Sequence, residues 1–367
     1  MFTALMFGFM HLFVTPTAGN EPVNFERLHI FLFNLVSGGS IILYFTEGRE
    51  KPSKKLVAFY ILGICYAVFA FLKIYIPAVA ISLALAAIVE SIRIKTFSFL
   101  PMDFFMSNKP VHRKFHQASL LCLSIGLVIS SVVIINNEYY HWVTMEKLKL
   151  DTFFLGFSFP LSLITMSVMF SFMQQAENFT FHVLKNIGFW TVNLGVIIFF
   201  LFILFEKLAP QILVTTTLFF CVLMIYYLYY HLGIREQQKQ FLTSGMGFLV
   251  FTALSGIAYI IMAFIPGYYD KDTGKFLMWL HTFVSLYGWN LSGLIVICRF
   301  SDFPIRFHSR WVIALHWATA AFLAPLGKYY QLFALLAMAG YIIILYMTFF
   351  SPGSKSRLAE ESRLSEV

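Results

Sequence analysis

Long runs of apolar residues, interrupted by short polar stretches, fill most of this 367-residue chain. An α-helix needs about 20 mostly apolar residues to cross the hydrocarbon core of a bilayer, and most of the runs have about that length. They lie at 2–15, 28–46, 56–74, 76–92, 116–136, 151–173, 186–205, 210–232, 241–264, 276–298, 310–326 and 329–350. The pattern therefore predicts an all-α, polytopic membrane protein of about twelve transmembrane helices, of which the first is the shortest.

The polar stretches between the runs are too short to hold a soluble domain. We therefore expect one transmembrane helical domain over 1–350, followed by a disordered cytoplasmic tail at 351–367. The alternative for the run at 2–15 is a signal peptide, which would need a basic segment before the apolar one. Phe2 follows Met1 directly, which favours a helix that stays in the membrane.

The composition agrees with this membrane assignment. Hydrophobic residues make up 59% of the chain and charged residues 12%, with a mean hydropathy of +0.77. Soluble domains are about half apolar and a quarter charged. The net charge of +8 resembles that of nucleic-acid-binding proteins, but the basic residues lie in short clusters between apolar runs, as in membrane proteins. The predicted partner is the lipid bilayer, and no nucleic acid is expected.

The basic residues also predict an orientation. With a cytoplasmic N-terminus, the predicted inner loops and the tail hold eighteen of the 26 lysines and arginines. Cytoplasmic loops of membrane proteins carry such an excess. Both termini are therefore predicted to be cytoplasmic.

Charged side chains are almost absent from the middle of the apolar runs. Glu90 lies near the predicted cytoplasmic end of its run, and Glu206 lies at the end of another. Ion and proton pumps normally carry ionisable groups partway across the membrane. Transporters also tend to have matching Gly or Pro interruptions in two halves, and the prolines here are not paired in that way. Both observations disfavour a transporter.

Two histidines lie at a similar predicted depth near the outer face. His29 begins the second run, His281 begins the tenth, and His11 approaches the outer end of the first. Two imidazoles on neighbouring helices can supply both axial ligands of a haem iron. Taken singly, each histidine fits a hydrogen-bonded packing residue better than a ligand, and the common depth of His29 and His281 is what favours a shared site.

Small residues follow both histidines. Ser285, Gly288 and Ser292 form a stripe after His281, and Gly38, Gly39 and Ser40 come two to three turns after His29. Such stripes leave room for a flat macrocycle and equally allow helices to pack closely.

The segments RLHIFLFNLVSGG and HTFVSLYGWNLSGL carry a family resemblance. They resemble the second and tenth helices of haem–copper oxidase subunit I and of the related NnrS-type haem proteins. The predicted number of twelve spans resembles the same family. The resemblance implies that His29 and His281 ligate a low-spin haem b, with His11 as an alternative ligand. It also places Lys328 beside the haem propionates. It further implies a bacterial inner membrane location within a respiratory complex, with a cytochrome or quinol as redox partner.

The chain departs from that family at the copper site. The oxidases take three copper-ligating histidines from the sixth and seventh helices, whereas the runs at 151–173 and 186–205 contain none. The usual second histidine of the tenth helix is also missing, because Thr282 and Phe283 follow His281. Dioxygen reduction is therefore not expected, which leaves electron transfer or gas sensing by a single haem. The alternatives are a cofactor-free structural or assembly subunit, a transporter and a lipid-modifying enzyme.

Overall fold

The computed structural model describes most of the chain. The described residues are 1–13, 24–49, 51–145, 147–148, 152, 154–174, 179–234, 237–265, 267 and 272–355. They are overwhelmingly helical, which confirms the predicted all-α class. Residues 356–367, most of the predicted tail, lie outside the described ranges.

Ten helices within the described ranges are long and apolar enough to cross a membrane. They correspond to ten of the twelve predicted runs. The other two runs are helical but shorter. The run at 2–15 contains α1 (Phe2–Phe7) and the short 3-10 helix η1 (Met10–Leu12). The run at 310–326 consists of α14 (Arg310–Trp317), the π-helix η8 (Ala318–Leu323) and α15 (Ala324–Leu326). The count of twelve and the orientation therefore stay predictions.

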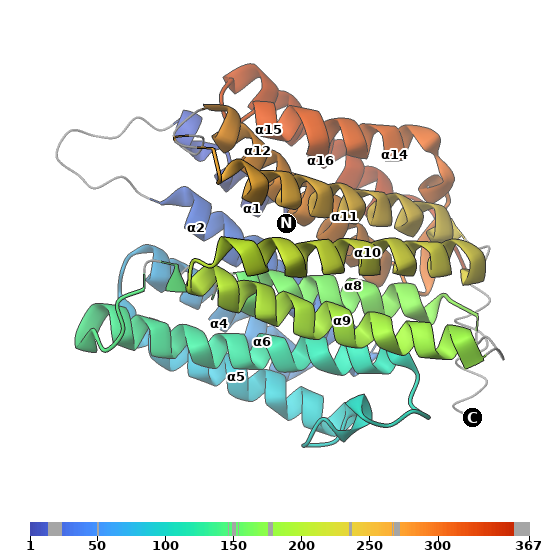
Figure 1. The fold of residues 1–367 in the computed structure, drawn as a ribbon, viewed down its shortest axis with the longest axis horizontal. Coiled ribbons are helices and arrows are strands. Elements are labelled where there is room, and N and C mark those ends of the chain that lie inside the picture. The colour runs from blue at the N-terminus through green and yellow to red at the C-terminus, as the bar shows by residue number, and fades with distance from the viewer. Residues whose placement is uncertain are drawn as a thin grey trace. The chain divides into compact units, whose positions relative to one another are not determined.

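The chain divides into two compact units. The first comprises Met1–Ser167 and Phe189–Val214. Besides α1 and η1, its elements are α2 (Phe25–Ile30), η2 (Phe31–Gly39), α3 (Ser40–Glu47), α4 (Lys54–Phe71), α5 (Tyr75–Thr96), η3 (Met102–Phe104), α6 (Val111–Ile135), η4 (Asn136–Tyr140) and η5 (Phe154–Ser158). Helices α5 and α6 lie side by side along much of their length (Figure 1).

The second unit comprises Val168–Gly188 and Thr215–Val367. Besides α14, η8 and α15, its elements are α11 (Gln237–Met262), α12 (Asp272–Phe283), η6 (Val284–Asn290), α13 (Leu291–Cys298), η7 (Ile305–His308) and α16 (Gln331–Phe349). Two three-residue strands, β1 (Asp302–Pro304) and β2 (Gly353–Lys355), pair antiparallel. The chain passes between the units within α8 (Phe159–Ser171), α9 (Phe179–Leu204) and α10 (Leu208–Leu232).

Local chemistry sets several helix ends. The hydroxyl of Ser53 accepts a hydrogen bond from the backbone N–H of Leu56 at 3.1 Å and caps the start of α4. Gly48 ends α3 in a left-handed conformation with φ +59°. This conformation is costly for residues with a Cβ and easy for glycine.

Burial distinguishes three of the spans from the rest. The spans Arg27–Glu47, Phe154–Ser171 and Gly274–Cys298 are 61%, 72% and 78% buried, whereas the other spans are between 22% and 56% buried. Each of the three contains a π-helix (η2, η5 or η6), and the span Val111–Tyr140 ends in another, η4. Three other spans separate each of them from the next. A helix that is apolar all round and buried belongs to a protein interior. Two of these three spans carry a candidate ligand: His29 lies in the first unit and His281 in the second.

Candidate functional site

His29 is held against the first helix of the chain. It lies on α2, which begins after Asn24, whose side chain accepts a hydrogen bond from the backbone N–H of Arg27 at 2.9 Å. The imidazole is buried, and its Nδ1 lies 2.6 Å from the backbone carbonyl oxygen of Ala4. One turn further along, a Cβ on Gly8 would lie 3.3 Å from the ring. The ring thus has the carbonyl of Ala4 in α1 as its hydrogen-bond acceptor, and it lies close to Gly8 at the end of α1.

His281 has the same setting in the second unit. Its Nδ1 lies 3.0 Å from the carbonyl oxygen of Thr252 on α11 and 3.3 Å from the hydroxyl of Ser255. A Cβ on Gly256 would lie 3.0 Å from Cε1 of the ring. In both units the carbonyl and the glycine are four residues apart, and they lie on an earlier helix than the histidine.

This setting selects one protonation form of each imidazole. A backbone carbonyl can only accept a hydrogen bond, so each Nδ1 is the protonated nitrogen and Nε2 carries the lone pair. Histidines that bind metals usually donate their other N–H to a carbonyl or carboxylate, which orients the ring and raises its basicity. His29 and His281 therefore have the tautomer that a ligand bound through Nε2 requires.

His316 provides a contrast. It is buried on α14, but the ring atom near a carbonyl is Nε2, which lies 2.6 Å from the oxygen of Tyr287. Its ring also stacks on Phe241. This histidine joins α14 to η6, as expected of a packing residue.

Both candidate histidines come just before a π-helix. His29 is followed by η2 from Phe31, and His281 by η6 from Val284. π-Helical turns have hydrogen bonds from i to i+5, are uncommon, and frequently occur at functional sites. A similar π-helix, η8, follows His316, so this feature does not by itself mark a ligand.

The small residues after the histidines pack helices together. A Cβ on Gly38 would come within 2.7 Å of Leu161, and one on Gly288 within 2.5 Å of Phe248. Ser292 faces Gly245 of α11. Of the two interpretations of these stripes, close packing is the one supported at these positions, so they are not counted toward a cofactor pocket.

Lys328 lies just after α15 and packs against α12. Its side chain is 8% exposed, and Nζ lies 4.1 Å from the centroid of the Trp279 ring and 6.0 Å from that of Phe283. Trp279 and Phe283 are each two residues from His281, and residues two apart on an α-helix point about 200° apart. Lys328 therefore covers a different face of α12 from the one that carries His281. Its role beside a haem propionate stays a prediction.

The side chain of His11, the alternative ligand, lies outside the described part of the structure. Among the residues that the structure describes, no three or more His, Cys, Asp or Glu side chains gather in a group that could hold a metal ion. A haem with two imidazole ligands does not need such a group, because the porphyrin supplies the other ligands.

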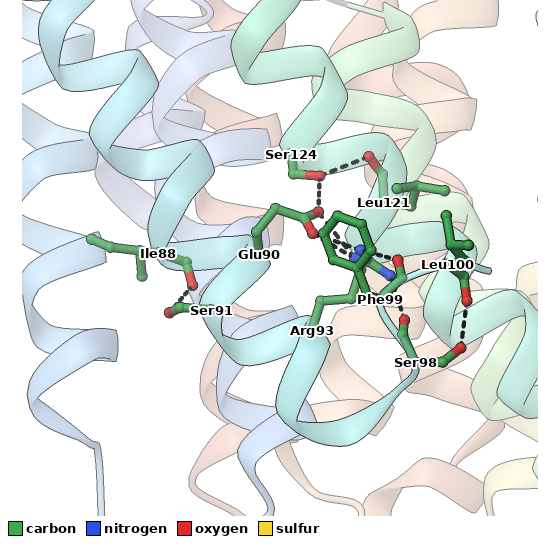
Figure 2. A network of polar contacts seen from close by, with 9 residues as sticks. All are labelled: Ile88, Glu90, Ser91, Arg93, Ser98, Phe99, Leu100, Leu121 and Ser124. Atoms are coloured by element: carbon green, nitrogen blue, oxygen red, sulfur yellow. Dashed lines mark hydrogen bonds and ion pairs between the residues drawn. The ribbon is translucent and has the colours of Figure 1, made fainter.

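A polar network that sequence reasoning did not find joins α5 to α6 (Figure 2). Arg93 donates to Glu90, with a closest distance of 2.7 Å, and to the carbonyls of Ser98 at 3.1 Å and Phe99 at 2.9 Å. The hydroxyl of Ser124 donates to the same carboxylate at 2.5 Å. The Arg93 side chain is 3% exposed and that of Glu90 30%. The i, i+3 spacing of the two charges was the available sequence clue.

Comparison of the chain with models of known protein families, with characterised proteins and with solved structures gives no match. A function must therefore be argued from the residues and their geometry.

Proposed function

We propose that this multi-pass membrane protein binds a b-type haem through His29 and His281 and transfers electrons. The observation that carries the proposal is the repeated histidine setting: in each unit, Nδ1 faces a backbone carbonyl and a glycine contacts the ring. The same tautomer, the one that a ligand bound through Nε2 requires, occurs on two of the three most buried spans, and this repetition supports the proposal.

The residues around the two rings would have distinct roles. Ala4 and Thr252 hold the imidazoles in one orientation through their carbonyl oxygens. Gly8 and Gly256 allow the supporting helices to approach the rings. A low-spin iron with two imidazole ligands changes oxidation state and has no open position for oxygen. The fixed rings would keep the ligand geometry the same in both oxidation states.

The proposed setting in the cell follows from the resemblance to haem–copper oxidases and NnrS-type proteins. The chain would lie in a bacterial inner membrane with both termini cytoplasmic. It would act as a subunit of a respiratory complex and exchange electrons with a quinol or a cytochrome. Because the copper ligands of the oxidases are missing from 151–173 and 186–205, reduction of dioxygen is not part of the proposal.

The test is a reduced-minus-oxidised visible spectrum of the detergent-purified protein, with the haem quantified as its pyridine haemochrome. We expect about one haem per chain, sharp α and β bands, and no spectral change on addition of carbon monoxide. A carbon monoxide-induced shift would favour gas sensing over electron transfer. A flat spectrum from a well-folded sample would contradict haem binding and favour a cofactor-free subunit or a transporter.

A further inference from the structure

A cavity of about 1280 Å³ opens in the second unit between the end of α10, the start of α11 and the start of α14. It exceeds the usual ~300–1,000 Å³ of small-molecule pockets. Its lining includes Tyr230, His231, Lys239, Ser244, Arg310 and Trp317. These residues come from one end of three apolar helices, so the cavity opens at one membrane surface. The distribution of lysines and arginines predicts that this surface is the cytoplasmic one.

The cavity changes character with depth. Arg310 is the first residue of α14, and Trp317 lies seven residues further on, roughly 10 Å deeper at 1.5 Å per residue. On α11, Gly247 lies eight residues beyond Lys239, roughly 12 Å deeper. The mouth is therefore cationic, and the inner part is lined by an indole ring and a glycine.

The cationic groups at the mouth suit a phosphate. Lys239 Nζ donates to the carbonyl oxygens of Tyr230 at 2.8 Å and Gly233 at 3.0 Å. An ammonium group has three N–H donors, so the third can donate to a phosphate. Arg310 is exposed, and its guanidinium group can donate two parallel hydrogen bonds to a phosphate. No aspartate or glutamate occurs among the described residues that line the cavity.

The inner wall is fixed in orientation. The indole N–H of Trp317 donates to the hydroxyl of Ser244 at 2.9 Å, and its ring stacks on Phe248 with centroids 3.9 Å apart. The flat face of the cavity is thus held in place.

We propose that this cavity binds an anionic membrane phospholipid, with its headgroup phosphate between Arg310 and Lys239 and an acyl chain along Trp317. Basic pockets between transmembrane helices on the cytoplasmic side are known to take anionic lipid headgroups. A soluble phosphate would use the mouth and leave the apolar wall exposed to water, whereas a phospholipid matches both parts. The proposal is independent of haem binding.

The test is quenching of tryptophan fluorescence by lipids brominated in their acyl chains. The protein is reconstituted in phosphatidylcholine vesicles, and brominated phosphatidylglycerol is compared with brominated phosphatidylcholine. We expect stronger quenching by the phosphatidylglycerol, and we expect Trp317→Phe to remove that difference. One basic residue contributes about five-fold to anionic-lipid binding, so Arg310→Gln is expected to lower the preference about five-fold and Arg310→Gln/Lys239→Gln further.

Arg306→Gln is the matched control. Arg306 is an exposed arginine of η7 that does not line the cavity, and its loss removes the same charge. The lipid preference of this variant should equal that of the wild type. An Arg310→Gln variant that keeps the full preference would overturn the proposal. Displacement of the brominated lipid by millimolar inorganic phosphate would overturn the lipid assignment and favour a soluble phosphate.

Discussion

Replacing Gly256 with alanine is expected to weaken haem binding without destabilising the fold. The added Cβ would lie 3.0 Å from Cε1 and 3.3 Å from Nδ1 of His281. Non-bonded carbon atoms rest at about 3.5–4.0 Å, so the ring must move by roughly half an ångström. Thr252 lies on the same face of α11, and the movement would stretch its 3.0 Å hydrogen bond beyond the normal range.

The expected magnitude follows from that hydrogen bond. Its loss removes about 0.5–1.5 kcal/mol, and removal of the partner that orients a metal-binding histidine typically costs about 10–100-fold in affinity. We expect haem affinity to fall about ten-fold. The helix itself should gain up to ~1 kcal/mol, because alanine is a better helix former than glycine.

The assay is a spectroscopic titration of haem into the haem-depleted protein, together with thermal unfolding in detergent. Gly63→Ala is the control, because a Cβ there would make an ordinary contact of 3.4 Å with Val36. That variant should bind haem as the wild type does. If Gly256→Ala bound haem as tightly as Gly63→Ala, with an unchanged spectrum, the proposal that Thr252 and Gly256 of α11 orient His281 would be refuted.

Two further predictions concern the first unit. Gly126→Ala should destabilise this unit strongly, because the new Cβ would lie 2.3 Å from the Cα of Gly156. That Cα is a backbone atom, which no side-chain rotation can move. A melting temperature equal to that of the wild type would contradict the close approach of Gly126 and Gly156. Arg93→Gln should cost about 1–3 kcal/mol, because it leaves the Glu90 carboxylate without its cation, and Glu90→Gln/Arg93→Gln should recover part of that loss. Thermal unfolding of the wild type, the single variant and the double variant checks this, and equal stability of the three proteins would show that the pair contributes nothing.

The sequence was sufficient for the membrane-spanning helices. Ten predicted runs correspond to apolar helices in the structure, because a span depends only on length and hydropathy. The predicted runs at 2–15 and 310–326 are shorter helical segments in the structure. The polar pair Glu90–Arg93 could have been found from its i, i+3 spacing.

The site could be predicted only in part. His29 and His281 were identified from their positions, but their partners Ala4 and Thr252 lie 25 and 29 residues away, and only packing brings them together. The predicted stripe of Ser285, Gly288 and Ser292 assumes α-helical spacing. Residues Val284–Asn290 form a π-helix with wider turns, so that spacing does not hold, and Gly288 packs on α11.

The most direct test of the central claim is the visible spectrum of purified His29→Ala and His281→Ala compared with that of the wild type. His182→Ala serves as the control, because His182 is exposed at the start of α9 and lies outside both histidine settings. Haem binding through both imidazoles predicts that either of the first two variants loses the low-spin bands while thermal unfolding shows an intact bundle, and that the control keeps them. Low-spin bands that survive in either variant, or their absence from the wild type, would contradict the proposed function.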